Sequence, residues 1–143
     1  LLQEEVKLKI VKAVVFPVIV YALPVFGGRL TLEGAVLVDR LQNSAVRFVY
    51  GLRKFDHVSQ YRRTARILPI KYIFKLQVAC LVHKVLLTGK PSYLRGMLQT
   101  RAEIRDCHTR QDAMLEVPRV RLEMGRNGFR YFGPQLYNSV PHS

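Results

Sequence analysis

The chain has 143 residues, of which 23 are Lys or Arg and 10 are Asp or Glu, so its net charge is +13. Because 49% of the residues are hydrophobic, the composition excludes a disordered basic tail and predicts a domain with a real core. A foldable chain with this excess of cations points first to nucleic acid as partner, and a merely basic surface is the alternative.

Two cysteines are too few for a disulfide framework and favour a reducing compartment. The first charges are Glu4 and Glu5 rather than the basic residues of a signal peptide. The most apolar run, Ala13 to Phe26, is shorter than the roughly 20 residues of a membrane span and is interpreted as core. We therefore expect a nuclear or cytoplasmic protein that is neither secreted nor inserted in a membrane.

The first part of the chain is helical in pattern. A helix is predicted from Gln3 to about Ala22, and Pro17 is expected to kink or split it. Thr31 and Gly51 predict the ends of a second helix, because threonine caps helix N-termini and glycine follows helix C-termini in the left-handed conformation. The predicted buried stripe of this second helix is Leu37, Leu41, Ala45, Phe48 and Leu52.

Two more helices follow. The first runs from about Ser59 to Ile67 and stops before Pro69, and the second runs from Ile70 to Thr88, where Gly89 closes it. A further turn is predicted around Tyr93-Leu94. The longest helix is expected to bury one face, made of Ile73, Phe74, Val78, Leu81 and Val85.

After Gly96 the periodicity is lost and residues 97–112 have the composition of a loop. Ala113 to Val117 and Gly128 to Phe132 are predicted as two strands around an Asn-Gly turn, and Pro134 to Ser139 as a final helical turn. The predicted fold class is therefore mainly α, with a helical bundle over residues 1–96 and a loop with a small β-hairpin over residues 97–143.

The chain carries few signs of catalytic chemistry. It has no glycine-rich phosphate loop and no Asp-Asp pair, and its acids are too scattered for a two-metal centre, so we expect no catalysis from this chain alone. The donor types Cys80, His83, Cys107 and His108 suit zinc. Because the first pair lies on a helix with a core stripe, a core thiol and an exposed histidine are favoured over a metal site.

The arginines are more informative. The predicted nucleic-acid-binding residues are Arg40 and Arg47, which share one helix face, and Arg62, Arg63 and Arg66, which fall on one arc of another helix. Three cations on one arc repel each other unless an anion joins them, which favours phosphate contact over a solvated face. Six aromatic residues could stack on bases, although core packing is the commoner role of such residues: Tyr50, Tyr61, Tyr72, Phe129, Tyr131 and Phe132.

Several segments, in this order, resemble the region after the palm domain of non-LTR retrotransposon reverse transcriptases, with the jockey-like group the most similar. They are Val11–Ala22 with Val25-Phe26-Gly27, Leu41–Gly51, Ile67–Ile70, His108-Thr109-Arg110, Val117–Arg121, Phe129–Pro134 and Leu136–Pro141. Phe26 and Tyr137 stand where the family commonly has tryptophan.

The resemblance implies a C-terminal fragment of an RNA-directed DNA polymerase. The chain begins with Leu1 rather than Met, so we expect it to be a piece of a longer protein. The resemblance implies that the finger and palm domains, with their magnesium-binding aspartates, lie before Leu1. The fragment would be the thumb and post-thumb region, inactive alone and without a cofactor of its own. The family's thumb grips the template–primer duplex, which matches the arginine helices. The alternative is a helical interaction module that docks by its apolar segment, Val14 to Phe26.

Overall fold

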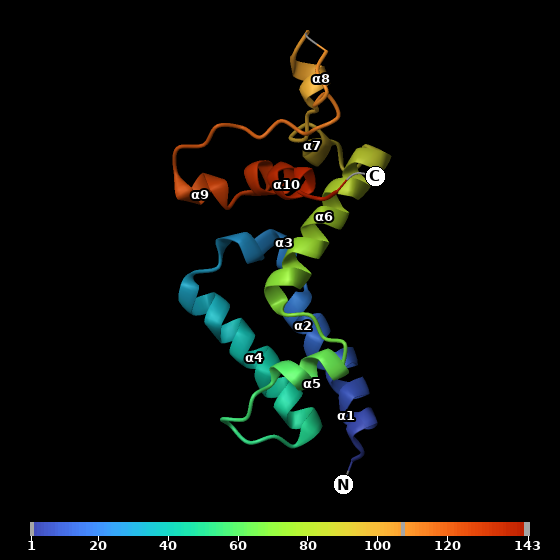
Figure 1. Cartoon of the computed structure of the whole chain (residues 1–143), viewed down its shortest axis with the longest axis vertical. Coiled ribbons are helices and arrows are strands. Elements are labelled where there is room, and N and C mark those ends of the chain that lie inside the picture. Colours follow the sequence, from blue (N-terminus) through green and yellow to red (C-terminus); the bar gives the residue numbers. More distant parts are fainter. Residues whose placement is uncertain (1, 107, 142–143) are drawn as a thin grey trace. The chain divides into compact units, whose positions relative to one another are not determined.

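The computed structural model describes residues 2–106 and 108–141 (Figure 1). Over these residues the chain is mainly helical and contains no β-strand, so the predicted α class is confirmed and the predicted β-hairpin is wrong. The chain divides into an N-terminal unit, Leu1–Leu23 with Leu30–Phe74, and a C-terminal unit, Pro24–Arg29 with Lys75–Ser143. The predicted domain boundary at residue 96 stays a prediction.

The N-terminal segment is a helical run that changes its pitch. Helix α1 (Glu4–Ile10) passes into the π-helical stretch η1 (Val11–Val15) and then into α2 (Phe16–Val20). The interruption predicted near Pro17 takes this form, because a wider turn accommodates a proline ring that has no amide to donate. The run ends at Ala22, whose φ is 52°, and α3 (Leu23–Phe26) and the 3-10 turn η2 (Gly27–Arg29) follow.

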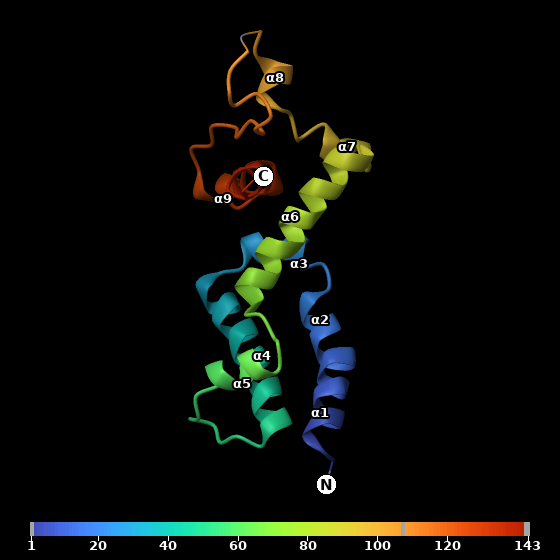
Figure 2. The same ribbon diagram turned by 45° about the vertical axis from the view of Figure 1, so that its right-hand side comes forward.

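Helix α4 (Leu32–Tyr50) begins and ends where the sequence predicts. The Thr31 hydroxyl oxygen accepts a hydrogen bond from the Gly34 amide at 3.1 Å, which satisfies one of the free amides of the first turn. Gly51 follows the helix with φ of 62°, the left-handed conformation expected there. Helix α1 lies beside α4 in both views (Figures 1 and 2).

The buried face of α4 differs from the predicted one. Of the predicted stripe, Ala45 is buried as expected, but Leu37, Leu41 and Phe48 are 62%, 52% and 55% exposed. Val46 and Val49, which lie outside that stripe, are fully buried. Apolar residues occur around much of this helix, so its periodicity is compatible with more than one stripe. Elements α1 and η1 cover the face of α4 that carries the small side chains Ala45 and Val49. This cluster consists of the buried Val11, Ala45 and Val49 and the half-buried Leu8, Val15, Phe16 and Tyr50.

Helix α5 (Ser59–Thr64) ends three residues earlier than predicted, and α6 (Ile70–Thr88) has the predicted bounds. Val78 and Val85 of α6 are buried as predicted, while Ile73, Phe74 and Leu81 are half-buried. In the N-terminal unit, a second cluster joins α4, α5 and the segment after it: Val46, Val58, Ala65 and Ile67. A third cluster contains Ile19, Leu23 and Ile70.

The C-terminal unit contains short helices in place of the predicted hairpin: α7 (Ser92–Arg95), α8 (Arg101–Ile104), α9 (Glu123–Arg126) and α10 (Phe129–Asn138). Gly128 has φ of −77° and stands at the N-terminus of α10, so it lacks the positive φ that an Asn-Gly hairpin turn requires. Phe129, Phe132 and Leu136 instead recur at helical spacing.

One antiparallel bridge, between Thr100 and Leu115, replaces the predicted strand pairing. The amide and carbonyl of Leu115 are not used by this bridge and are taken by a side chain of α10. The Leu115 amide donates to Asn138 Oδ1 at 2.9 Å, and Asn138 Nδ2 donates to the Leu115 carbonyl at 2.8 Å. Asn138 therefore satisfies the backbone amide and carbonyl of the almost fully buried Leu115, as a neighbouring strand would.

Replacing Asn138 with alanine is expected to destabilise the chain by about 2 kcal/mol, because it leaves two backbone polar groups without partners in a partly buried place. Denaturant unfolding of the whole chain measures this change. Asn127→Ala is the matched control, since Asn127 is exposed, and it should alter the free energy of unfolding by less than about 0.5 kcal/mol. Equal losses in the two variants would contradict this role of Asn138.

Candidate nucleic-acid interface

Three of the predicted site residues lie together. Arg62, Arg63 and Arg66 line one open hollow of about 440 Å³ on the N-terminal unit, together with Pro69 and Tyr72. Arg63 and Arg66 are exposed and Arg62 is half-buried. No carboxylate is among the described residues that line this hollow, so its polar lining is cationic.

The end of α5 sets the direction of these arginines. The Arg66 amide donates to the Arg63 carbonyl at 3.1 Å, and the Ile67 amide donates to the Arg62 carbonyl at 2.9 Å. These two bonds form the C-terminal motif in which the residue after the helix is left-handed and is most often glycine. Here that residue is Arg66, with φ of 55°. A β-carbon costs about 1–2 kcal/mol in this conformation, so the chain holds an arginine at a strained position.

Two polar side chains from other elements hold the segment that carries the hollow. Lys12 Nζ donates to the Ala65 carbonyl at 2.9 Å, and Gln42 Nε2 donates to the Leu68 carbonyl at 2.7 Å. Gln42 is fully buried on the core face of α4. Sequence reasoning missed both residues. A signal for Gln42 was present, because it is the polar residue on the stripe that contains Ala45, Val46 and Val49.

The aromatic candidates of the N-terminal unit separate into two kinds. The rings of Tyr50 and Tyr61 lie 5.0 Å apart and pack against the second core cluster, so they join α4 to α5. Tyr72, in the first turn of α6, is 48% exposed and lines the hollow. The Lys71 ammonium lies over one face of the Tyr72 ring, 4.9 Å from its centre, and leaves the other face for a further contact.

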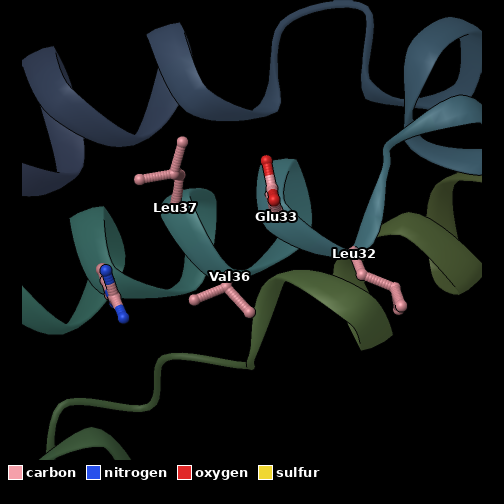
Figure 3. Close-up of a pocket in the computed structure, with 5 residues that line it drawn as sticks. Leu32, Glu33, Val36 and Leu37 are labelled. Atoms are coloured by element: carbon pink, nitrogen blue, oxygen red, sulfur yellow. The ribbon is translucent and has the colours of Figure 1, made fainter.

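The other two predicted arginines lie elsewhere on α4. Arg47 is half-buried, and its Nη2 donates to the Asp56 carbonyl at 3.3 Å, which ties the loop after α4 back to the helix. Arg40 lines a separate hollow of about 380 Å³ with four residues at the start of α4: Leu32, Glu33, Val36 and Leu37. In Figure 3, Glu33 and Leu37 point to one side of the helix and Leu32 and Val36 to the other.

Within the described residues, no group of three His, Cys, Asp or Glu side chains is placed to hold a metal ion. His83 Nδ1 lies 3.1 Å from the Tyr137 hydroxyl, and His108 Nδ1 lies 3.2 Å from Asp112 Oδ2. Cys107, the remaining candidate ligand, lies outside the described residues.

The backbone amide of Thr109, followed by its hydroxyl and by His108, lowers the pKa of the Asp112 carboxyl.

The apolar N-terminal segment keeps much of its surface open. Val14, Val18 and Tyr21 are 62%, 76% and 80% exposed. The interpretation of Ala13 to Phe26 as core is confirmed for Ile19 and Leu23 and is wrong for these exposed residues. Among the described residues, the helical elements from Glu4 to Arg29 are together long and apolar enough to cross a membrane by length and composition alone, and 17% of their apolar 18-residue window is buried. No known protein family, curated protein or solved structure matches this chain.

Proposed function

We propose that this chain is a non-catalytic thumb and post-thumb fragment of an RNA-directed DNA polymerase of a non-LTR retrotransposon. Its role is to grip the template–primer duplex through Arg62, Arg63 and Arg66. The observation that carries the proposal is the cationic hollow, in which these three side chains meet without a carboxylate. Polymerisation itself, with its magnesium, belongs to the finger and palm domains of the parent protein.

The chemistry of the hollow favours a phosphate backbone as its occupant. Like charges in one hollow repel, and an anion that joins them relieves this repulsion. A guanidinium group presents two parallel donors that match two phosphate oxygens, which a single ammonium group does not. Phosphates carry no base information, so this contact fits a polymerase that must hold any template sequence.

The direct test is the salt dependence of binding to a DNA duplex and to an RNA–DNA hybrid. Each phosphate neutralised by the protein releases counterions and contributes about −0.9 to the slope of log affinity against log salt. Three contacts in the hollow therefore predict a slope of about −2.7 or steeper. A slope near zero would exclude backbone contact by these residues.

The second candidate function is a protein-interaction module, and the exposed Val14, Val18 and Tyr21 favour it. In this function the apolar face docks on another domain of a parent protein or on a separate protein partner. Apolar contacts are not screened by salt, so docking would persist at ionic strengths that abolish duplex binding. A fragment of a polymerase can have both functions, because a thumb separated from its palm exposes the surface that the palm covers.

Replacing Arg66 with glycine is expected to make the chain more stable and its duplex binding weaker. Removing the β-carbon removes a strain of about 1–2 kcal/mol from the folded chain. Glycine also gives the unfolded chain more conformational freedom, which offsets about half of this stabilisation. The expected net gain in the free energy of unfolding is up to about 1 kcal/mol, and the salt slope should flatten by about 0.9.

The matched control is Ala22→Gly, since Ala22 is also left-handed, with φ of 52°, and carries no charge. It should show the same gain in stability with an unchanged salt slope. Denaturant unfolding and duplex titration measure the two quantities. A loss of stability in Arg66→Gly, or an equal effect of both variants on binding, would contradict this role of Arg66.

A further inference from the structure

We propose that the hollow holds an unpaired nucleotide, with its base stacked on the Tyr72 ring and its phosphates bound by the arginines. This places the junction between duplex and single strand at the end of α5. The inference rests on the proposed nucleic-acid-binding function and goes beyond it, since a grip on duplex phosphates needs no aromatic ring.

The hollow combines two kinds of surface. Arg62, Arg63 and Arg66 supply donors for phosphate oxygens, while Pro69 and Tyr72 supply flat, apolar contact area. A phosphate alone would use only the first kind of surface. The hollow is open and has a volume of about 440 Å³, which is room for a base as well as its phosphate.

A base pair inside a duplex cannot use the Tyr72 ring. Within a duplex both faces of each base are covered by neighbouring bases, and proteins reach only the edges. Unpaired bases expose their faces, and proteins that bind single strands stack aromatic side chains on them beside a cationic groove. The ring and the arginines together therefore select a strand that is unpaired at this point.

Tyr72 is the exposed aromatic residue that lines the hollow with the three arginines. Phe48 and Phe55 are also exposed and have a lysine over the ring, but neither is among the described lining residues of this hollow. The Tyr72 ring is 48% exposed, whereas Tyr50 and Tyr61 contact each other in the core. The Tyr72 amide donates to the Pro69 carbonyl at 2.9 Å, which fixes its backbone in the first turn of the 19-residue helix α6, and its side chain lines the hollow.

The test compares two probes with the whole chain: a blunt DNA duplex and the same duplex extended by unpaired thymidines. Tyr72→Ala should weaken binding to the extended duplex by about ten- to a hundredfold and change binding to the blunt duplex by less than about twofold. Tyr72→Phe keeps the ring and should bind both probes as the unchanged chain does.

The matched control is Tyr21→Ala. Tyr21 is 80% exposed and lines a hollow of about 310 Å³ with Pro17 and Val18, in which no arginine lies among the described lining residues. This variant should leave both affinities unchanged. An equal effect of Tyr72→Ala on the two probes, or no effect on either, would overturn the unpaired nucleotide.

A second measurement does not depend on the stability of the variants. One thymidine of the extension is replaced by 5-iododeoxyuridine, which cross-links under ultraviolet light to an aromatic side chain stacked on it. The expected product is a peptide that contains Tyr72, and a cross-link confined to other residues would overturn the inference. The proposed function is judged separately, because loss of the salt slope in the arginine variants does not depend on Tyr72.

Discussion

Replacing Arg62, Arg63 and Arg66 together with alanine should flatten the salt slope of duplex binding by about 2.7, because each phosphate contact contributes about −0.9 on B-form DNA. The loss should be the same for every duplex sequence, since phosphates carry no base information. Titrations of one duplex at several salt concentrations, repeated with a second sequence, measure both properties. This is the largest binding effect that we expect from any change in the chain.

The control must remove the same charge from another place without disturbing the fold. Arg95, Arg101 and Arg105 are poor choices, because they pair with Glu103 or Glu116 at 2.8 to 3.9 Å. Arg119, Arg121 and Arg126 are exposed, and the described structure shows no ion pair for them. If both triple variants flatten the slope equally, only bulk charge acts and the hollow is not the contact.

Leu23→Ala should lower the free energy of unfolding by about 2–5 kcal/mol, the range for large-to-small changes in a core. Leu23 is 0% exposed and packs with Ile19 and Ile70. Its truncation leaves a cavity, because the closely packed neighbouring side chains cannot fully move into the space. Denaturant unfolding of the whole chain measures the change.

The matched control is Leu37→Ala, because Leu37 belongs to the predicted stripe of α4 but is 62% exposed. It should change the free energy of unfolding by less than about 0.5 kcal/mol. The pair therefore tests which face of the N-terminal unit is the core. A larger loss for Leu37→Ala than for Leu23→Ala would restore the stripe that the sequence pattern favours.

The sequence alone determined the features that depend on neighbouring residues. Thr31 and Gly51 mark the ends of α4, and Gly89 marks the end of α6, because caps and left-handed glycines act within one turn. The net charge was equally visible, and so was the shared surface of Arg62 and Arg63, because both lie on α5. The predicted helical arc was wrong for Arg66, which follows α5 in the left-handed conformation.

The tertiary structure decided what depends on residues distant in sequence. The core face of α4 follows from the helices that cover it, and an apolar helix offers them more than one stripe. Gly128 begins a helix rather than a turn, and Asn138 takes the place of a strand beside Leu115. The hollow itself joins α5 to the first turn of α6 through Pro69. Tyr72 lies near the arginines because of how α5 and α6 pack. The spacing of residues in the sequence does not give the angle between two helices joined by a bend.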